Sequence, residues 1–135
     1  MTAPASELQT AVVARLTADA RLLKLLGSAR IYDRAVRDAA YPYVVLAALR
    51  TTDWTTGTEP GAEHRLTFHV WSRAAGRHQA ADIADALRAA LADARPAMTG
   101  HRVISLQHEA TELPPRNGEL WQAVVRFRAV TEPAA

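Results

Sequence analysis

Histidine is the residue type in this chain best suited to binding a metal ion or moving a proton, and the sequence holds five. Two of them, His64 and His69, lie in one alternating segment at an odd spacing, so they point to opposite faces of a strand and cannot share a metal ion. Neither the His-x-x-x-His nor the His-Glu-x-x-His spacing of helical zinc sites occurs, and no cysteine is present. The pattern predicts no metal site.

Nucleophile and acid–base patterns are also missing from the sequence. No serine lies in a Gly-x-Ser-x-Gly elbow, and the glycines Gly57 and Gly61 are not followed by Gly-Lys-Ser/Thr, the end of a phosphate loop. Glu109 and Glu112 are an odd number of residues apart, so a regular strand places them on opposite faces, where they make a poor acid–base pair. We therefore expect no enzyme, no catalytic residue and no cofactor.

Length and composition predict one domain over residues 1–135, large enough to bury a core without a metal or disulfide. The chain has 16 basic and 14 acidic residues, a net charge of +2, and its basic residues form no run, which does not favour nucleic-acid binding. No apolar run approaches the roughly 20 residues that span a bilayer. The first residues lack the pattern of a secretory signal, so we expect a soluble protein that stays in the cytoplasm.

The elements that would position any site begin with a helical pattern over residues 6–18. Its apolar stripe is Leu8, Val12 and Leu16. Ser6 and Gln9 fit a capping box at its start. A second short helix is predicted between Asp19, a helix-capping residue, and Gly27, a residue that ends helices in the left-handed region. A single helix kinked near residues 17–19 fits the same pattern.

Strand patterns follow. Residues 31–32 form a short strand, and the nearly continuous apolar run over residues 43–49 predicts a strand buried on both faces. Residues 63–71 alternate, with Leu66, Phe68 and Val70 on one face. Between these two strands, residues 51–61 form a long polar tip with little to bury except Trp54. Long loops on a rigid sheet commonly bind partners, although a tip without order in the isolated subunit is equally compatible with this composition.

The second half of the chain predicts a helix over residues 78–94 and two more strands. The apolar face of the helix is Ala80, Ile83, Ala84, Leu87, Ala90, Leu91 and Ala94. Strands over residues 103–113 and 120–130 are joined by a turn at residues 114–118, where Asn117 and Gly118 form the strongest hairpin signal. The order α(α)-β-β-β-α-β-β predicts an α+β fold, an antiparallel sheet of four to five strands with helices packed on one face.

The other face of the predicted sheet combines aromatic and charged side chains: Arg65, His69, Trp71, Gln122, Arg126 and Arg128. Trp beside Arg is typical of the centres of protein interfaces. The alternative for Trp71 and Trp121 is that each fills the core. We predict a protein-interface site made of Asp53, Trp54, Thr55, Arg65, Trp71, Arg73, Arg116 and Arg126.

Four pieces of sequence also carry a family resemblance. They are Leu8-Gln9-x-Ala11; Leu25-Leu26-Gly27 leading to Arg30-Ile31-Tyr32-Asp33; Tyr41-Pro42-Tyr43-Val44-Val45-Leu46; and Val70-Trp71-Ser72 followed by Gly76 and the helix near Ala80. In this order and spacing the chain resembles the tail-completion, or tail-terminator, proteins of long-tailed bacteriophages and gene transfer agents. The resemblance covers residues 8–106, and the last hairpin matches in shape.

The resemblance implies a virion structural protein assembled in the bacterial cytoplasm. The resemblance implies hexameric rings that cap the head-proximal end of the tail tube, stop its polymerisation and meet head-completion (stopper) proteins. DNA passes through the ring without sequence-specific binding, and no membrane or cofactor is involved. Open sheet edges, expected near Ile31 or the last strand, would suit pairing with a neighbour.

Three alternatives remain at this point. One is another head–tail connector or minor tail component of the same virion. A second, of another class, is a small ligand-binding or hydrolytic α+β domain, which needs a polar pocket with convergent titratable groups. A third is a DNA-binding protein, which needs arginines gathered on one face.

Overall fold

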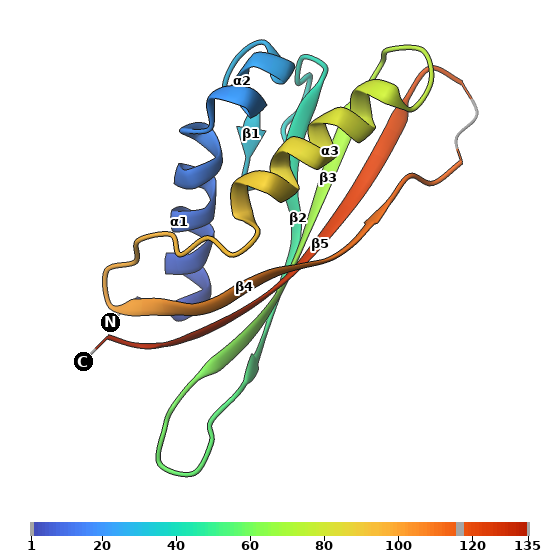
Figure 1. Cartoon of the computed structure of the whole chain (residues 1–135). Helices are drawn as coiled ribbons and strands as arrows, with labels where there is room; N and C mark the ends of the chain where they lie inside the picture. Colours follow the sequence, from blue (N-terminus) through green and yellow to red (C-terminus); the bar gives the residue numbers. More distant parts are fainter. Residues whose placement is uncertain (1, 116–117, 135) are drawn as a thin grey trace.

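The computed structural model describes residues 2–115 and 118–134 and confirms the predicted α+β class (Figure 1). The elements in chain order are α1 (Pro4–Thr17), α2 (Ala20–Leu26), β1 (Ile31–Tyr32), β2 (Tyr43–Asp53), β3 (Ala62–Ser72), α3 (His78–Leu91), β4 (His101–Glu112) and β5 (Trp121–Pro133). The turn predicted at residues 114–118 includes Arg116 and Asn117, which lie outside the described residues.

The five strands form one mixed sheet in the order β1-β2-β3-β5-β4. Every neighbouring pair is antiparallel except β1 with β2, which pair in parallel through Ile31 with Val44 and Tyr32 with Val45. The edge expected near Ile31 is therefore confirmed. The edge expected at the last strand is wrong, because β5 lies between β3 and β4. This strand carries buried residues such as Val125 and Phe127, and a strand this apolar belongs inside a sheet.

Helix α1 begins earlier than the sequence predicts. The predicted capping box at Ser6 and Gln9 is wrong: the helix starts at Pro4, the residue before it makes no side-chain cap, and Gln9 donates to the carboxylate of Asp33 at 3.1 Å instead. Proline suits the first position of a helix because its φ is already helical and its missing N–H would have had no partner there.

The other helix ends follow the sequence signals more closely. Two separate helices form, since Asp19 accepts a hydrogen bond from the amide of Leu22 at 2.9 Å and Gly27 ends α2 at a φ of 83°. Helix α3 ends at Leu91, three residues before the predicted end. The chain turns there because Asp93 adopts a φ of 60° and its amide donates to the carbonyl of Leu106 at 2.9 Å.

The core lies between the three helices and one face of the sheet (Figure 1). The predicted apolar face of α3 is buried there, together with Phe68 and Phe127, whose rings meet edge to face at 5.9 Å. The prediction that β2 is buried on both faces holds only at its start. Val44, Val45 and Leu46 are buried, whereas a bulge follows Leu46 and the next two residues are exposed.

The tip between β2 and β3 is more regular than the sequence predicts. Residues 51–53, predicted as loop, belong to β2, and the hairpin continues past the strands (Figure 1). The amide of Trp54 donates to the carbonyl of Gly61 at 3.0 Å, and Thr56 and Glu59 exchange backbone hydrogen bonds of 2.9 and 2.7 Å. The hairpin therefore projects from the body of the molecule as an ordered arm.

A small polar cluster is buried where β2, β3, β5 and β4 reach α1. The ring of His64 is fully buried and bonds to the hydroxyls of Thr51 at 2.8 Å and Thr131 at 2.9 Å. Nearby, the carboxylate of Glu7 accepts from the amide of Gly100 at 2.6 Å and bonds to Nδ1 of His101 at 2.9 Å. The Gly100 amide, with help from His101, lowers the pKa of Glu7, and so this cluster ties α1 to the start of β4.

The environment of His64 predicts a loss of stability in acid. Burial, with a smaller effect of His101, lowers the pKa of His64 to about 4 from its ordinary value of 6.5. Between these two values the unfolded chain binds a proton at His64 and the folded chain does not, so stability falls as the pH falls. We expect the free energy of unfolding to drop by about 2 kcal/mol more in the wild-type chain than in His64→Gln between about pH 7 and pH 5.

Urea denaturation at the two pH values measures this difference. His78 is exposed at the start of α3, so His78→Gln serves as the matched control and should keep the wild-type pH dependence. Equal pH dependence in His64→Gln and the wild-type chain would show that the buried imidazole is not responsible.

Candidate functional site

The candidate site is the sheet face turned away from the helices, called here the open face, together with the projecting hairpin. The strand register places three arginines from adjacent strands side by side on this face, because Arg50 pairs with Arg65 and Arg65 pairs with Arg128. We call these three residues the arginine row. The neighbouring rows add Glu63, Thr67, His69, Trp71, Gln122, Val124, Arg126 and Val130. The predicted alternation of β3 is thus confirmed, with Leu66, Phe68 and Val70 on the buried side.

Arginines and glutamates on the open face form a network. Arg65 pairs with Glu109 and lies 3.5 Å from Glu63, while Arg128 donates to Glu63 at 2.8 Å. A further pair joins Arg126 to Glu112. Arg128, followed by Arg65, lowers the pKa of Glu63, and Glu109 raises the pKa of Arg65. These contacts offset the repulsion between arginines that lie directly opposite each other on neighbouring strands.

This network corrects the expectation that Glu109 and Glu112 face opposite sides of β4. The register of β4 shifts between His108 and Ala110, so Glu109 is the extra residue of a β-bulge. Both carboxylates consequently reach arginines of the open face, Arg65 and Arg126. Each carboxylate forms an ion pair with a different arginine, so the two glutamates serve to balance charge on this face.

At the base of the hairpin, Trp54 forms an exposed aromatic patch. Its side chain is 45% exposed, and the guanidinium of Arg128 lies 4.9 Å from its ring centre, a cation–π contact that holds the ring in place. Trp54 and Ile104, which is 37% exposed, border the same hollow of ≈ 120 Å³, and Val130 also lines it. Within the described part of the chain these two are the exposed large hydrophobic residues.

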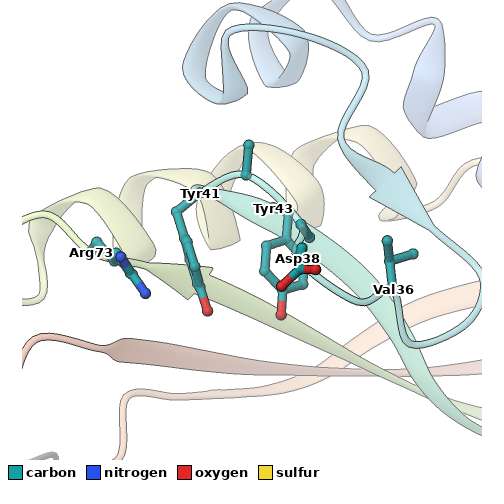
Figure 2. Close-up of a pocket in the computed structure, with 7 residues that line it drawn as sticks. Val36, Asp38, Tyr41, Tyr43 and Arg73 are labelled. Carbon is teal, nitrogen blue, oxygen red and sulfur yellow. The ribbon is translucent and has the colours of Figure 1, made fainter.

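At the opposite end of β2, aromatic side chains surround a second hollow. An open hollow of ≈ 630 Å³ lies here, and Figure 2 shows Tyr41 and Tyr43 directed to the same side of it. Its other lining residues are Val36, Asp38, Ala39, Ala40 and Arg73. Their ring centres are 5.3 Å apart, and Arg73 lies 4.7 Å from the centre of Tyr41. Burial, together with Tyr41 and Tyr32, raises the pKa of Tyr43. Tyrosine rings beside an arginine are typical of protein interfaces.

The predicted interface residues fall into three places. Asp53, Trp54 and Thr55 lie at the base of the hairpin, where Asp53 accepts from the amide and the hydroxyl of Thr55 at 3.2 and 2.6 Å. Arg65 and Arg126 belong to the network of the open face, and Trp71 and Arg73 lie at the far end of β3 or just beyond it. Arg116 lies outside the described residues. Whether these residues form an interface stays a prediction.

The alternative interpretation, that Trp71 and Trp121 each fill the core, is wrong, because neither side chain is buried. Trp71 is half-buried on the open face, with its ring 6.2 Å from that of His69. Trp121 is half-buried at the start of β5, where Arg77 lies 5.4 Å from its ring centre. Both side chains therefore combine an apolar body with partial exposure, which is typical of interface residues.

Sequence reasoning missed Arg50 and Ile104. The register of β2 against β3 brings Arg50 beside Arg65, and no alternation pattern fixes a register between two strands. Ile104 is exposed because the register of β4 shifts between Val103 and Ser105. The sequence offers no signal for that bulge. The separation of His64 and His69 onto opposite faces is confirmed.

The described residues were also compared with the requirements of a metal site and of a membrane-spanning helix. Residues 2–115 and 118–134 contain no group of three His, Asp or Glu side chains that could hold a metal ion. No helix in those ranges is long and apolar enough to cross a membrane.

Comparison with known proteins identifies relatives of the whole chain. The family model described as Tail completion protein gp17 matches residues 10–132. Among solved structures, a chain in the virion of a native gene transfer agent (GTA) particle is 29% identical, with a TM-score of 0.87, and the match covers 98% of this chain and 99% of that chain. No curated protein matches the sequence.

The exposure of Trp54 predicts that it contributes little to folding. Trp54→Ala removes the cation–π contact with Arg128 and the covered half of a surface ring but leaves no cavity in the core, so we expect it to lower the free energy of unfolding by less than about 2 kcal/mol. Phe68→Ala, which empties a core position, should cost about 3–5 kcal/mol. Chemical denaturation of both variants measures the contrast, and losses of equal size would place Trp54 in the core.

Proposed function

Because the chain belongs to the Tail completion protein gp17 family, we propose that it forms a ring that caps the head-proximal end of a tail tube. The ring stops polymerisation of the tube and joins the tail to head-completion proteins. The chain is accordingly a structural component of a virion tail.

The full-length similarity to a virion chain carries this proposal. The match has a TM-score of 0.87 and covers 98% of this chain and 99% of that chain, so the two chains share the same fold from end to end of the compared segments. The relative belongs to an assembled gene transfer agent particle. A protein of the same shape and length is therefore best understood as a piece of an assembly, working through its surfaces.

Ring closure needs two different patches on each copy, so that one patch of a copy meets the other patch of the next. The molecule offers two patches of different chemistry at opposite ends of β2. One is the apolar hollow beside Trp54 and Ile104, and the other is the hollow of Tyr41, Tyr43 and Arg73. This difference supports a head-to-tail contact between copies, and a hexamer is the ring that the family resemblance implies.

The proposed role implies three kinds of partner: further copies of the chain, the tail tube protein, and a head-completion or stopper protein. DNA would pass through the ring without sequence-specific binding. The structure does gather arginines on one face, but glutamates pair with Arg65, Arg126 and Arg128, so the charge available to phosphates is small. We propose a single domain with a structural role rather than an enzymatic one.

Shortening the projecting hairpin tests its part in termination. In this variant residues 55–60 are replaced by a two-residue Asn-Gly turn, which keeps the Trp54–Gly61 pairing and the fold. We expect tails assembled with this variant to be abnormally long or to lack heads, because the tip of the arm, which we propose meets the tube, is missing. Electron microscopy of tail lengths measures the effect.

The matched control is Thr56→Ala, which alters the tip while keeping its length, and it should give tails of normal length. If tails assembled with the shortened hairpin have normal length and carry heads, the arm has no role in termination. If the wild-type chain were found at another position in the virion, the alternative of a different head–tail connector or minor tail component would hold.

A further inference from the structure

The outer side of β2 is an unpaired strand edge over most of its length. β1 pairs with β2 only at Val44 and Val45, whereas β2 continues to Asp53. In the described part of the chain no other strand pairs with β2 on that side. Apart from half-buried Leu49, residues 47–53 are exposed. This free edge lies on the projecting hairpin (Figure 1).

Hydrogen-bond alternation identifies the backbone groups that the edge offers. In an antiparallel pair, successive residues direct their N–H and C=O groups alternately toward and away from the partner strand. Trp54 donates across the hairpin to Gly61, and the register is regular from Ala48 to Asp53. Leu49, Thr51 and Asp53 therefore direct their donors and acceptors outward, where an added strand would bind them.

The opposite edge of the sheet, β4, is protected by comparison. The carbonyl of Leu106 accepts from the amide of Asp93 at 2.9 Å, and the carbonyl of Val103 accepts from Arg95 at 3.4 Å. Register shifts near Ile104 and Glu109 interrupt the rest of this edge. Bulges and covering segments are the usual means of preventing strand addition. Among the described residues, the stretch of β2 from Ala48 to Asp53 has no register shift and no hydrogen bond from a covering segment to its outward backbone groups.

The charges beside the free edge indicate what kind of strand would fit it. Arg50 is exposed at the outer end of the arginine row, and no described carboxylate forms an ion pair with it. The inner members of the row, Arg65 and Arg128, both share Glu63. A carboxylate on an added strand, directly opposite Arg50, would complete the same pattern of alternating charge.

We propose that the free edge of β2 accepts an extended segment of a different virion protein as a sixth strand, with a carboxylate beside Arg50. This inference rests on the proposed function in one respect, namely that the partner is a protein of the same virion. A second copy of the chain is a poor donor, because its β4 edge is protected. Pairing β2 with the β2 of another copy would bring two Arg50 side chains close together, which is unfavourable.

Hydrogen–deuterium exchange, compared between the purified chain and assembled particles, tests the proposal at single amides. In the purified chain the outward amides of Leu49, Thr51 and Asp53 should exchange quickly, while those of Arg50 and Thr52 are already bonded to β3. In particles we expect the three outward amides to become protected. If the chain is present in particles and these amides still exchange quickly, strand addition is wrong and the proposed function stands. If the chain is absent from tails, the proposed function fails.

A pair of variants at Thr51 isolates the backbone contribution. Thr51→Pro and Thr51→Val both remove the hydroxyl that bonds to His64, but only proline removes the outward N–H and obstructs an added strand. Thr51→Val should enter particles like the wild-type chain, and Thr51→Pro about tenfold less. Equal incorporation of the two folded variants would overturn the proposal.

If Thr51→Pro does not fold, Arg50→Gln and Arg50→Glu provide the comparison, because both lie on the surface. Incorporation should fall more with Arg50→Glu than with Arg50→Gln, since only the former repels the partner's carboxylate. Equal incorporation of these two variants would also contradict the proposal. Protection of the outward amides in concentrated purified chain alone would identify a second copy as the strand donor and overturn the assignment to another protein.

Discussion

Helices cover only one face of the sheet, and this asymmetry governs the rest of the structure. Three helices cover one side, and the alternation of β3 and β5 directs Phe68, Val70, Phe127 and their neighbours into that layer. The remaining side chains of the same strands must then occupy an uncovered face. In a sheet of five strands this face is large. Its side chains must either pair with one another or be covered by another protein.

On the open face, the exposed side chains are stabilised mainly by ion pairs with one another, since no helix in the described part of the chain packs over them. Arginines that the strand register places side by side are paired with glutamates from two strands, β3 and β4, and one of these glutamates, Glu109, reaches the face through a β-bulge. Such an arrangement keeps the face soluble in the free subunit, and it lets a partner exchange one ion pair for another at small cost. The exposed apolar side chains stand apart from it, at Trp54 and Ile104, where they border one hollow.

The sequence predicts the fold well because its signals are local. The period of two in β3, the cap at Asp19, the glycine after α2 and the apolar stripe of α3 each describe a few neighbouring residues. The site is predicted less completely, because it depends on register between distant strands. Neither the row of Arg50, Arg65 and Arg128 nor the bulges at Ile104 and Glu109 can be deduced from alternation. The place of β5 inside the sheet, between β3 and β4, is likewise known only from the strand pairing. Trp54 was predictable as an exposed aromatic in a polar segment, but its contact with Arg128 was not.

A protein that acts by its surfaces has to be seen with the surfaces that it meets. The most direct test is a reconstruction of the head–tail junction from particles that contain this chain. We predict a closed ring of copies at the head-proximal end of the tube, with the hairpin arm of each copy against its neighbours in the assembly. A chain found as isolated copies, or at the distal end of the tail, would contradict the account.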